Sequence, residues 1–228
     1  MSNSTQHIKL DGEIKSLRDR LNKSENEIYM STEKAVKILS ENNWVVSFLS
    51  VDDLKKQNSK SKEEILDYVE KYYTENNHRN FFMYFDDLIK NFETNSEDRG
   101  YLEQLRIIEQ LLKNNFRYYI VLLSTAMGIL EYKYIQKNGR LNTSDIAHGS
   151  EICENALKKR KSATDVLERI DIKSTYDVLE NYYQISHFEN GINRSEFGRH
   201  AVQHGRYNPE RYKETDMIKT ILLIYAIC

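Results

Sequence analysis

Apolar residues recur along the chain at the spacing of amphipathic helices, and the pattern is strongest after Tyr101. Leu102, Leu105 and Ile108 fall at intervals of three residues and predict one helix. The stretch Tyr119–Leu130 is apolar on all sides, which predicts the buried central helix of a bundle, ended by Asn138-Gly139. Further helices are expected over about 145–158, 163–171, 175–189 and 193–204, and from about 210 to the end. The pattern predicts an all-α protein, an antiparallel helical bundle over 96–228.

The first hundred residues continue the helical pattern. A heptad-like stripe of Leu10, Ile14, Leu17 and Leu21 predicts a helical arm over 1–30, which could dock on its own domain or pair with a partner helix. A helical region is expected over 31–95. Its predicted helices lie at about 33–50, from the capping box Ser61-Lys-Glu-Glu64 onward, and around 81–89. The polar stretch Glu93–Gly100 is the predicted boundary with the bundle.

The composition excludes several classes of fold and of function. The 228 residues include 8 glycines and 1 proline, too few for the many turns of a sandwich or barrel. The net charge of −2 argues against a strongly basic nucleic-acid coat protein but permits a local basic site. Cys153 and Cys228 cannot build a disulfide framework. The longest uncharged apolar stretch, 118–130, is shorter than the roughly 20 residues that cross a bilayer. We therefore expect a cytoplasmic protein with no membrane contact.

The segment 193–206, Asn-Arg-Ser-Glu-Phe-Gly-Arg-His-Ala-Val-Gln-His-Gly-Arg, gathers cationic and titratable side chains at a helix end. Cleavage of RNA without a metal needs a base for the 2′-hydroxyl, an acid for the 5′-oxygen and a cation for the phosphorane. Histidine titrates near neutral pH, and arginine stays charged and can bind two phosphate oxygens. His204 is expected at the C-terminal end of its helix, where the carbonyl groups favour a protonated ring. These residue types make Arg199 and His204 candidates for a catalytic pair, and Arg194, Gln203, Arg206 and Tyr207 candidates for substrate binding.

Helix geometry complicates this site. On an ideal helix Arg199 and His204 lie about 140° apart, so they do not share a face. One catalytic histidine does not easily serve as both acid and base. Two chains around a two-fold axis would bring two histidines and two arginines to one cleft. The chemistry thus predicts a homodimer.

The stretch Arg199-His-Ala-Val-Gln-His204 resembles the R-x4-6-H motif of HEPN domains, in which a polar residue often follows the arginine. The stretch Arg-His-x-x-x-His-Gly over 199–205, which comes before a last apolar helix, is similar to the corresponding stretch of bacterial HEPN proteins of defence and toxin type. This resemblance implies a metal-independent endoribonuclease acting on RNA as a homodimer, with no cofactor and with a possible antitoxin partner. It implies Arg199 and His204 as the catalytic pair and His200 as the polar helper. Such relatives often carry an acidic residue on the buried helix; Met127 stands at the expected place, and Glu131 lies one turn on.

Other interpretations stay open. Many HEPN domains serve as binding units without activity, so the motif could hold RNA, a nucleotide or a protein partner. His200 and His204 at i and i+4 could bind zinc, with His187 or His148 as a third ligand. Most tyrosines fall at core spacing, whereas Tyr207 and Tyr212 could contact RNA. The basic run Lys158-Lys-Arg-Lys161 suits a solvated helix end or an RNA backbone contact.

Overall fold

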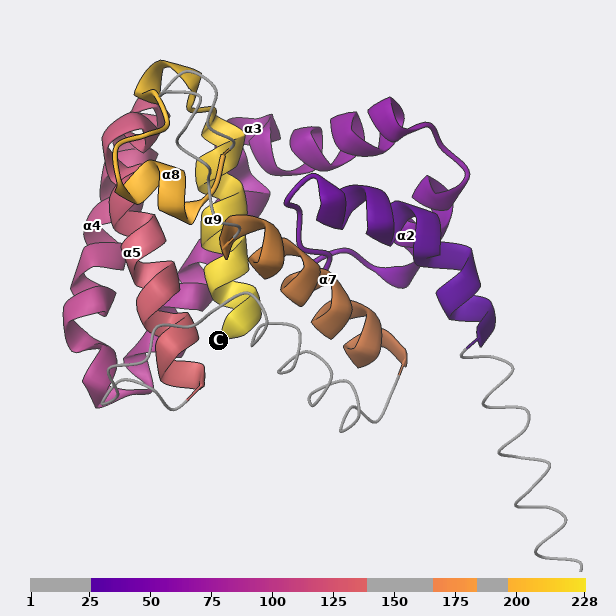
Figure 1. Ribbon diagram of the computed structural model, residues 1–228, viewed down its shortest axis with the longest axis horizontal. Helices are drawn as coiled ribbons and strands as arrows, with labels where there is room; N and C mark the ends of the chain where they lie inside the picture. Colours follow the sequence, from indigo (N-terminus) through magenta and orange to yellow (C-terminus); the bar gives the residue numbers. More distant parts are fainter. Residues whose placement is uncertain (1–25, 139–165, 184–196) are drawn as a thin grey trace, which may run out of the picture.

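The computed structural model describes residues 26–138, 166–183 and 197–228, and every regular element in these ranges is a helix (Figure 1). A helix covers 26–41. It is followed by α2 (Val51–Asn58), α3 (Lys62–Glu93), η1 (Ser96–Asp98), α4 (Arg99–Asn114), η2 (Phe116–Tyr118), α5 (Tyr119–Lys137), α7 (Val166–Tyr183), α8 (Arg199–Gln203), η5 (Pro209–Arg211) and α9 (Glu214–Ile227). The prediction of an all-α fold is confirmed. The helical arm expected over 1–30, the helix expected over 145–158 and the basic run 158–161 lie wholly or mostly outside the described residues.

Four helices form the bundle: the C-terminal half of α3, with α4, α5 and α9 (Figure 1). Short turns join α3 to α4 and α4 to α5, so each is the antiparallel neighbour of the one before. The helix α9 is the most apolar and buries side chains around its whole circumference, among them Met217, Ile221 and Leu223. The helix α5 is less enclosed than predicted, because Val121 is 68% exposed at its N-terminal end. None of the described helices is long and apolar enough to cross a membrane.

The start of α3 follows the sequence signal closely. The Ser61 hydroxyl accepts a hydrogen bond from the Glu64 amide at 3.2 Å, and the Glu64 carboxylate accepts one from the Ser61 amide at 2.9 Å. These two bonds are the predicted capping box, and they satisfy amides that the first helical turn leaves unpaired. The helix then breaks at 75–78, where Asn76, Asn77 and His78 take φ values of 52°, 54° and 61°. The helix expected around 81–89 is therefore the second half of α3, running to Glu93.

The helix expected over 33–50 ends earlier. Helical geometry stops at Glu41, and Asn43 adopts a positive φ of 64°, a conformation that asparagine tolerates well. The chain then runs through the buried Trp44, and Ser50 caps the separate helix α2 by accepting a hydrogen bond from the Asp53 amide. The apolar spacing continues across this break because Trp44 and the valines after it face the same core as the helix before.

Hydrogen bonds connect residues 40–46, in the N-terminal region, to α7. The Ser40 hydroxyl donates to the Ser174 hydroxyl at 3.1 Å, and the Val46 amide donates to the same oxygen at 3.3 Å. The Asn181 side-chain amide donates to the Ser40 carbonyl at 3.1 Å. Ser174 lies where two predicted helices, 163–171 and 175–189, were expected to meet. It is instead inside the continuous helix α7, because its hydroxyl is satisfied by the neighbouring segment.

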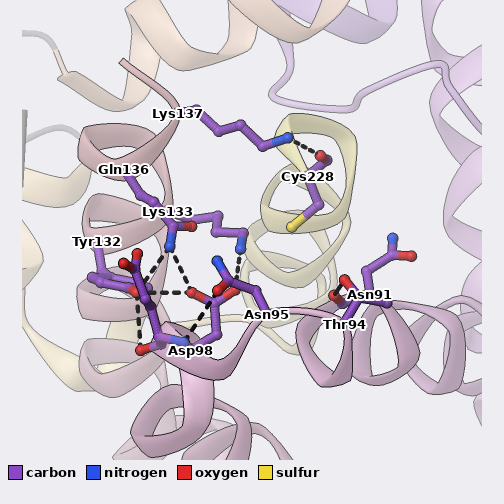
Figure 2. A network of polar contacts seen from close by, with 10 residues as sticks. Asn91, Thr94, Asn95, Asp98, Tyr132, Lys133, Gln136, Lys137 and Cys228 are labelled. Carbon is purple, nitrogen blue, oxygen red and sulfur yellow. Dashed lines mark hydrogen bonds and ion pairs between the residues drawn. The ribbon is translucent and has the colours of Figure 1, made fainter. Parts of the chain in front are cut away.

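The predicted boundary over 93–100 is a tight turn between packed helices (Figure 2). Asp98 is fully buried there and forms an ion pair with Lys133 of α5, which is 5% exposed. The hydroxyl of Tyr132 and the side-chain amide of Gln136 each donate to Asp98 at 2.8 Å. Burial raises the pKa of Asp98, but these three donors outweigh it, and the net pKa is lowered. Residues on both sides of the turn contribute to one continuous hydrophobic core.

The last helix begins later than predicted. Pro209 opens the short turn η5 rather than a helix, and Asn208 caps that turn by accepting from the Glu210 amide at 3.1 Å. The chain extends through Tyr212, and α9 starts at Glu214. The start was predicted too early because Pro209 suits the first turn of either helix type.

Candidate functional site

The short helix α8 (Arg199–Gln203) carries most of the motif, and it packs on α5 and α7. Its inner face consists of Ala201 and Val202, which are 0% and 3% exposed. Gly198 precedes it at a close approach, because a Cβ atom there would lie 3.3 Å from the Tyr182 carbonyl oxygen. The helix predicted over 193–204 starts later than expected, because Phe197 and Gly198 are not helical. Residues 193–196 lie outside the described residues.

The C-terminal end of α8 agrees with the prediction. His204 is the C-cap residue, and its amide donates to the His200 carbonyl at 3.2 Å. Gly205 follows with a φ of +64°, the left-handed conformation in which glycine commonly ends helices. The amides of Arg206 and Tyr207 then donate to the Ala201 carbonyl at 2.8 Å and 3.0 Å. This tight turn leaves the His204 side chain exposed at the end of the helix.

Arg199 points toward the bundle. Its guanidinium Nη2 donates a hydrogen bond to the carboxylate of Glu131 on α5, and the two side chains are 19% and 24% exposed. The guanidinium carbon also lies 5.7 Å from the centre of the Tyr183 ring on α7. Burial raises the pKa of Tyr183, and the carboxylate of Glu131 raises it further. The arginine therefore joins α8 to both of the helices on which it rests.

The two histidines of α8 lie together. Their ring centres are 4.5 Å apart, and the ring planes are inclined by 59°. Residues at i and i+4 of a helix face the same side, which accounts for the contact. Burial lowers the pKa of His200, and the nearby His204 and Arg199 lower it further. The neutral form of the His200 ring is favoured, as a general base requires.

The structure therefore groups the predicted catalytic residues as a histidine pair beside an anchored arginine. His204 meets His200, whereas Arg199 turns to Glu131 and Tyr183. This arrangement agrees with the expected angular separation of Arg199 and His204.

The predicted substrate-binding residues have different environments. Gln203 is partly exposed on α8 and Arg206 is exposed just beyond it, whereas Arg194 lies outside the described residues. Tyr207 is 7% exposed, and its ring stacks on Tyr212 with centres 5.7 Å apart and planes inclined by 6°. Tyr212 is itself 8% exposed, so both rings belong to the core. This burial leaves neither ring a free face on which a base could stack, and contact of the two tyrosines with RNA stays an untested prediction.

A metal centre was the other interpretation of the histidines. Within the described ranges, no group of three or more histidine, cysteine, aspartate or glutamate side chains is placed to hold a metal ion. His187 and His148, considered as third ligands, lie outside those ranges. The zinc interpretation stays untested, because its third ligand would come from one of those two histidines.

In comparisons with known proteins, no family model, curated protein or solved structure matches this chain significantly. The site's interpretation depends on its own geometry and on the motif over 199–204.

Two partners of Arg199 had weak signals in the sequence. Glu131 was noted only because it lies one turn beyond Met127, where the motif resemblance expects an acidic residue, and nothing in the spacing links it to Arg199, 68 positions away. Tyr183 lies in the helix expected over 175–189, and no pattern in the sequence distinguishes a core tyrosine from one that faces a guanidinium.

Proposed function

We propose that this protein is a metal-independent endoribonuclease. The observation that carries the proposal is the cluster on α8: His200 and His204 with ring centres 4.5 Å apart, next to Arg199. Two imidazoles supply the base and the acid of a phosphodiester cleavage, and a guanidinium supplies positive charge for the phosphorane. The resemblance of 199–204 to the R-x4-6-H motif of HEPN domains supports the same chemistry.

The reaction is a transesterification within the RNA. A base takes the proton of the 2′-hydroxyl, the 2′-oxygen attacks phosphorus, and the bond to the 5′-oxygen breaks as an acid protonates that oxygen. The products are a 2′,3′-cyclic phosphate and a free 5′-hydroxyl. Arg199 has five N–H donors, so its guanidinium can contact a phosphate oxygen while Nη2 remains on Glu131. Gln203 and Arg206 flank the cluster and would bind the RNA backbone.

The proposal includes a homodimer, in which two such clusters face a shared RNA, and a cytoplasmic role in phage defence or in a toxin–antitoxin system with a protein antitoxin. These parts come from the motif resemblance and the chemistry. Each has a direct measurement: the mass of the purified protein in solution, and a pull-down from the native host.

A second candidate function is a helical interaction module without catalysis. The ion pair between Arg199 and Glu131 favours it, because a guanidinium that anchors α8 has a structural role regardless of any substrate. In that case the protein would bind RNA or a protein partner, and substitution of Arg199 would change the fold around α8 rather than a rate.

The test is cleavage of total RNA by the purified full-length protein in EDTA, with mapping of the cut ends. We expect cleavage by the wild type, and none by His204→Ala or Arg199→Ala at unchanged mass and helicity. His148→Ala is the matched control, since His148-Gly149 is a second His-Gly pair of the chain, and it should cleave normally. Full activity of His204→Ala after repurification would contradict the proposal. A stoichiometric partner without turnover of any RNA would favour the interaction module.

A further inference from the structure

We infer that His200 and His204 of one chain form a complete acid–base pair, with His200 as the general base and His204 as the general acid. The inference rests on the proposed function and assigns roles within its site. In this inference both catalytic histidines come from one chain. The sequence had instead suggested that a second chain supplies the second histidine.

The geometry of α8 supports a pair within one chain. The imidazole rings project from consecutive turns of the same helix face, with centres 4.5 Å apart. The His204 amide donates to the His200 carbonyl at 3.2 Å, which fixes the backbone between them. The inference requires that these two rings reach the entering 2′-oxygen and the leaving 5′-oxygen of one phosphate.

The surroundings of the two rings differ in the direction that the two roles need. His200 is partly buried near the cation of Arg199, and burial, His204 and Arg199 all lower its pKa. His204, by contrast, is exposed to solvent at the C-cap of α8. A general base must begin neutral, so His200 suits the 2′-hydroxyl, and the exposed His204 is the ring left to donate a proton to the 5′-oxygen.

Proton transfer balances within the pair. His200 gains the proton of the 2′-hydroxyl as the 2′-oxygen bonds to phosphorus. His204 loses its proton to the 5′-oxygen as the old phosphorus–oxygen bond breaks. The two rings finish with their protonation states exchanged, and solvent restores them. The Arg199 cation, whose charge is partly balanced by Glu131, opposes protonation of His200 and so helps it to release the proton.

Mixed dimers distinguish one chain from two. His200→Ala and His204→Ala chains with different tags are co-expressed, and the mixed dimer is isolated by tandem purification. If both histidines act from the same chain, no complete pair exists in the mixed dimer, and it is as inactive as either single variant. If they act across the two-fold axis, one of two sites is intact and about half of the wild-type rate returns. Recovery of that rate would overturn the inference, and a wild type that is active as a monomer would support it.

A titration by NMR provides a readout that does not depend on turnover. The ring signals are assigned with the two single variants, and RNA is absent. We expect the pKa of His200 to lie below its ordinary value and to rise in His204→Ala, because a neighbouring cation has been removed. Independent titration of the two rings would contradict the pairing.

The experiments distinguish a failure of the acid–base pair from a failure of the proposed function. If the wild type cleaves RNA but His200→Ala retains full activity, the pair is wrong and the proposed function stands. If the wild type cleaves no RNA, the proposed function fails and the catalytic roles fail with it.

Discussion

The guanidinium of Arg199 on α8 donates a hydrogen bond to the carboxylate of Glu131 on α5, 68 positions away in the sequence. This contact orients the arginine of the proposed site. It also places a negative charge next to a cation that would bind phosphate. The pair therefore has two effects, one on the position of the arginine and one on the charge that the RNA meets.

Glu131→Gln separates these effects. We expect kcat to fall by roughly 10- to 100-fold, since a displaced catalytic group reacts much more slowly. We expect KM for RNA not to rise, because the substitution removes a negative charge near the phosphate. Steady-state kinetics on a short single-stranded RNA measures both values. The control is Glu210→Gln, at an exposed glutamate of η5. An unchanged kcat would show that Glu131 does not orient Arg199.

Lys133→Met should destabilise the fold strongly. It removes the ion-pair partner of the fully buried Asp98, and breaking a buried pair costs about 3–5 kcal/mol. Chemical denaturation monitored by circular dichroism measures this loss. The matched control is Lys71→Met, since Lys71 pairs with Asp67 at 2.8 Å and both side chains are more than half exposed. The control should cost no more than about 1 kcal/mol. Equal losses in the two variants would contradict the account of the buried network.

Asp171→Asn should stabilise the protein at neutral pH. Burial raises the pKa of Asp171, and the hydrogen bond from the Ser47 hydroxyl only partly offsets this. A carboxyl whose folded pKa is raised favours folding below its unfolded pKa, and that contribution is lost as pH rises through the folded value. Asparagine keeps an oxygen for Ser47 and carries no charge. We expect a Tm increase of about 2–4 °C at pH 7, or roughly 1 kcal/mol, and a smaller difference at pH 3. A lower Tm at pH 7 would refute the argument.

Gly198→Ala tests the close approach of α8 to α7. The new Cβ atom would lie 3.3 Å from the Tyr182 carbonyl oxygen and 3.7 Å from that of Asn181, and backbone atoms yield little. We expect a loss of about 1–3 kcal/mol and shifted ring signals of His200 and His204. Gly128→Ala is the contrasting variant, because nothing lies within 4 Å of its Cβ position in the middle of α5. It should gain up to about 1 kcal/mol from helix propensity. A change of the same sign in the free energy of unfolding of both variants would contradict this prediction.

Local signals in the sequence predicted local structure well. The capping box at Ser61 and Glu64 formed as expected, because both partners lie within one helical turn. The end of α8 at His204 and Gly205 was also predicted, since glycine readily takes the positive φ found there. The break after Glu41 was missed, because Trp44 and its neighbours remain apolar and buried through a turn that asparagine permits.

These local signals could not predict contacts between segments that lie far apart in the sequence. Asp98 lay in a polar stretch that suggested a boundary, and Lys133 lay on an apolar helix. Their pairing depends on how α4 and α5 meet, which spacing along the chain does not encode. Ser174 separated two predicted helices, yet the fold satisfies its hydroxyl from Ser40 and Val46. The histidine pair was visible as i and i+4 spacing, whereas the turn of Arg199 toward Glu131 required the packing of α8 on α5.

With five residues, α8 is far too short to hold a helical shape by itself in water. Its form is imposed by the surfaces of α5 and α7 and by the tight turn through Gly205. A synthetic peptide of this segment would lose the spacing of the two imidazoles. Grafting the motif into another scaffold would thus require transplanting the supporting helices as well, because the reactive arrangement is a property of the whole framework.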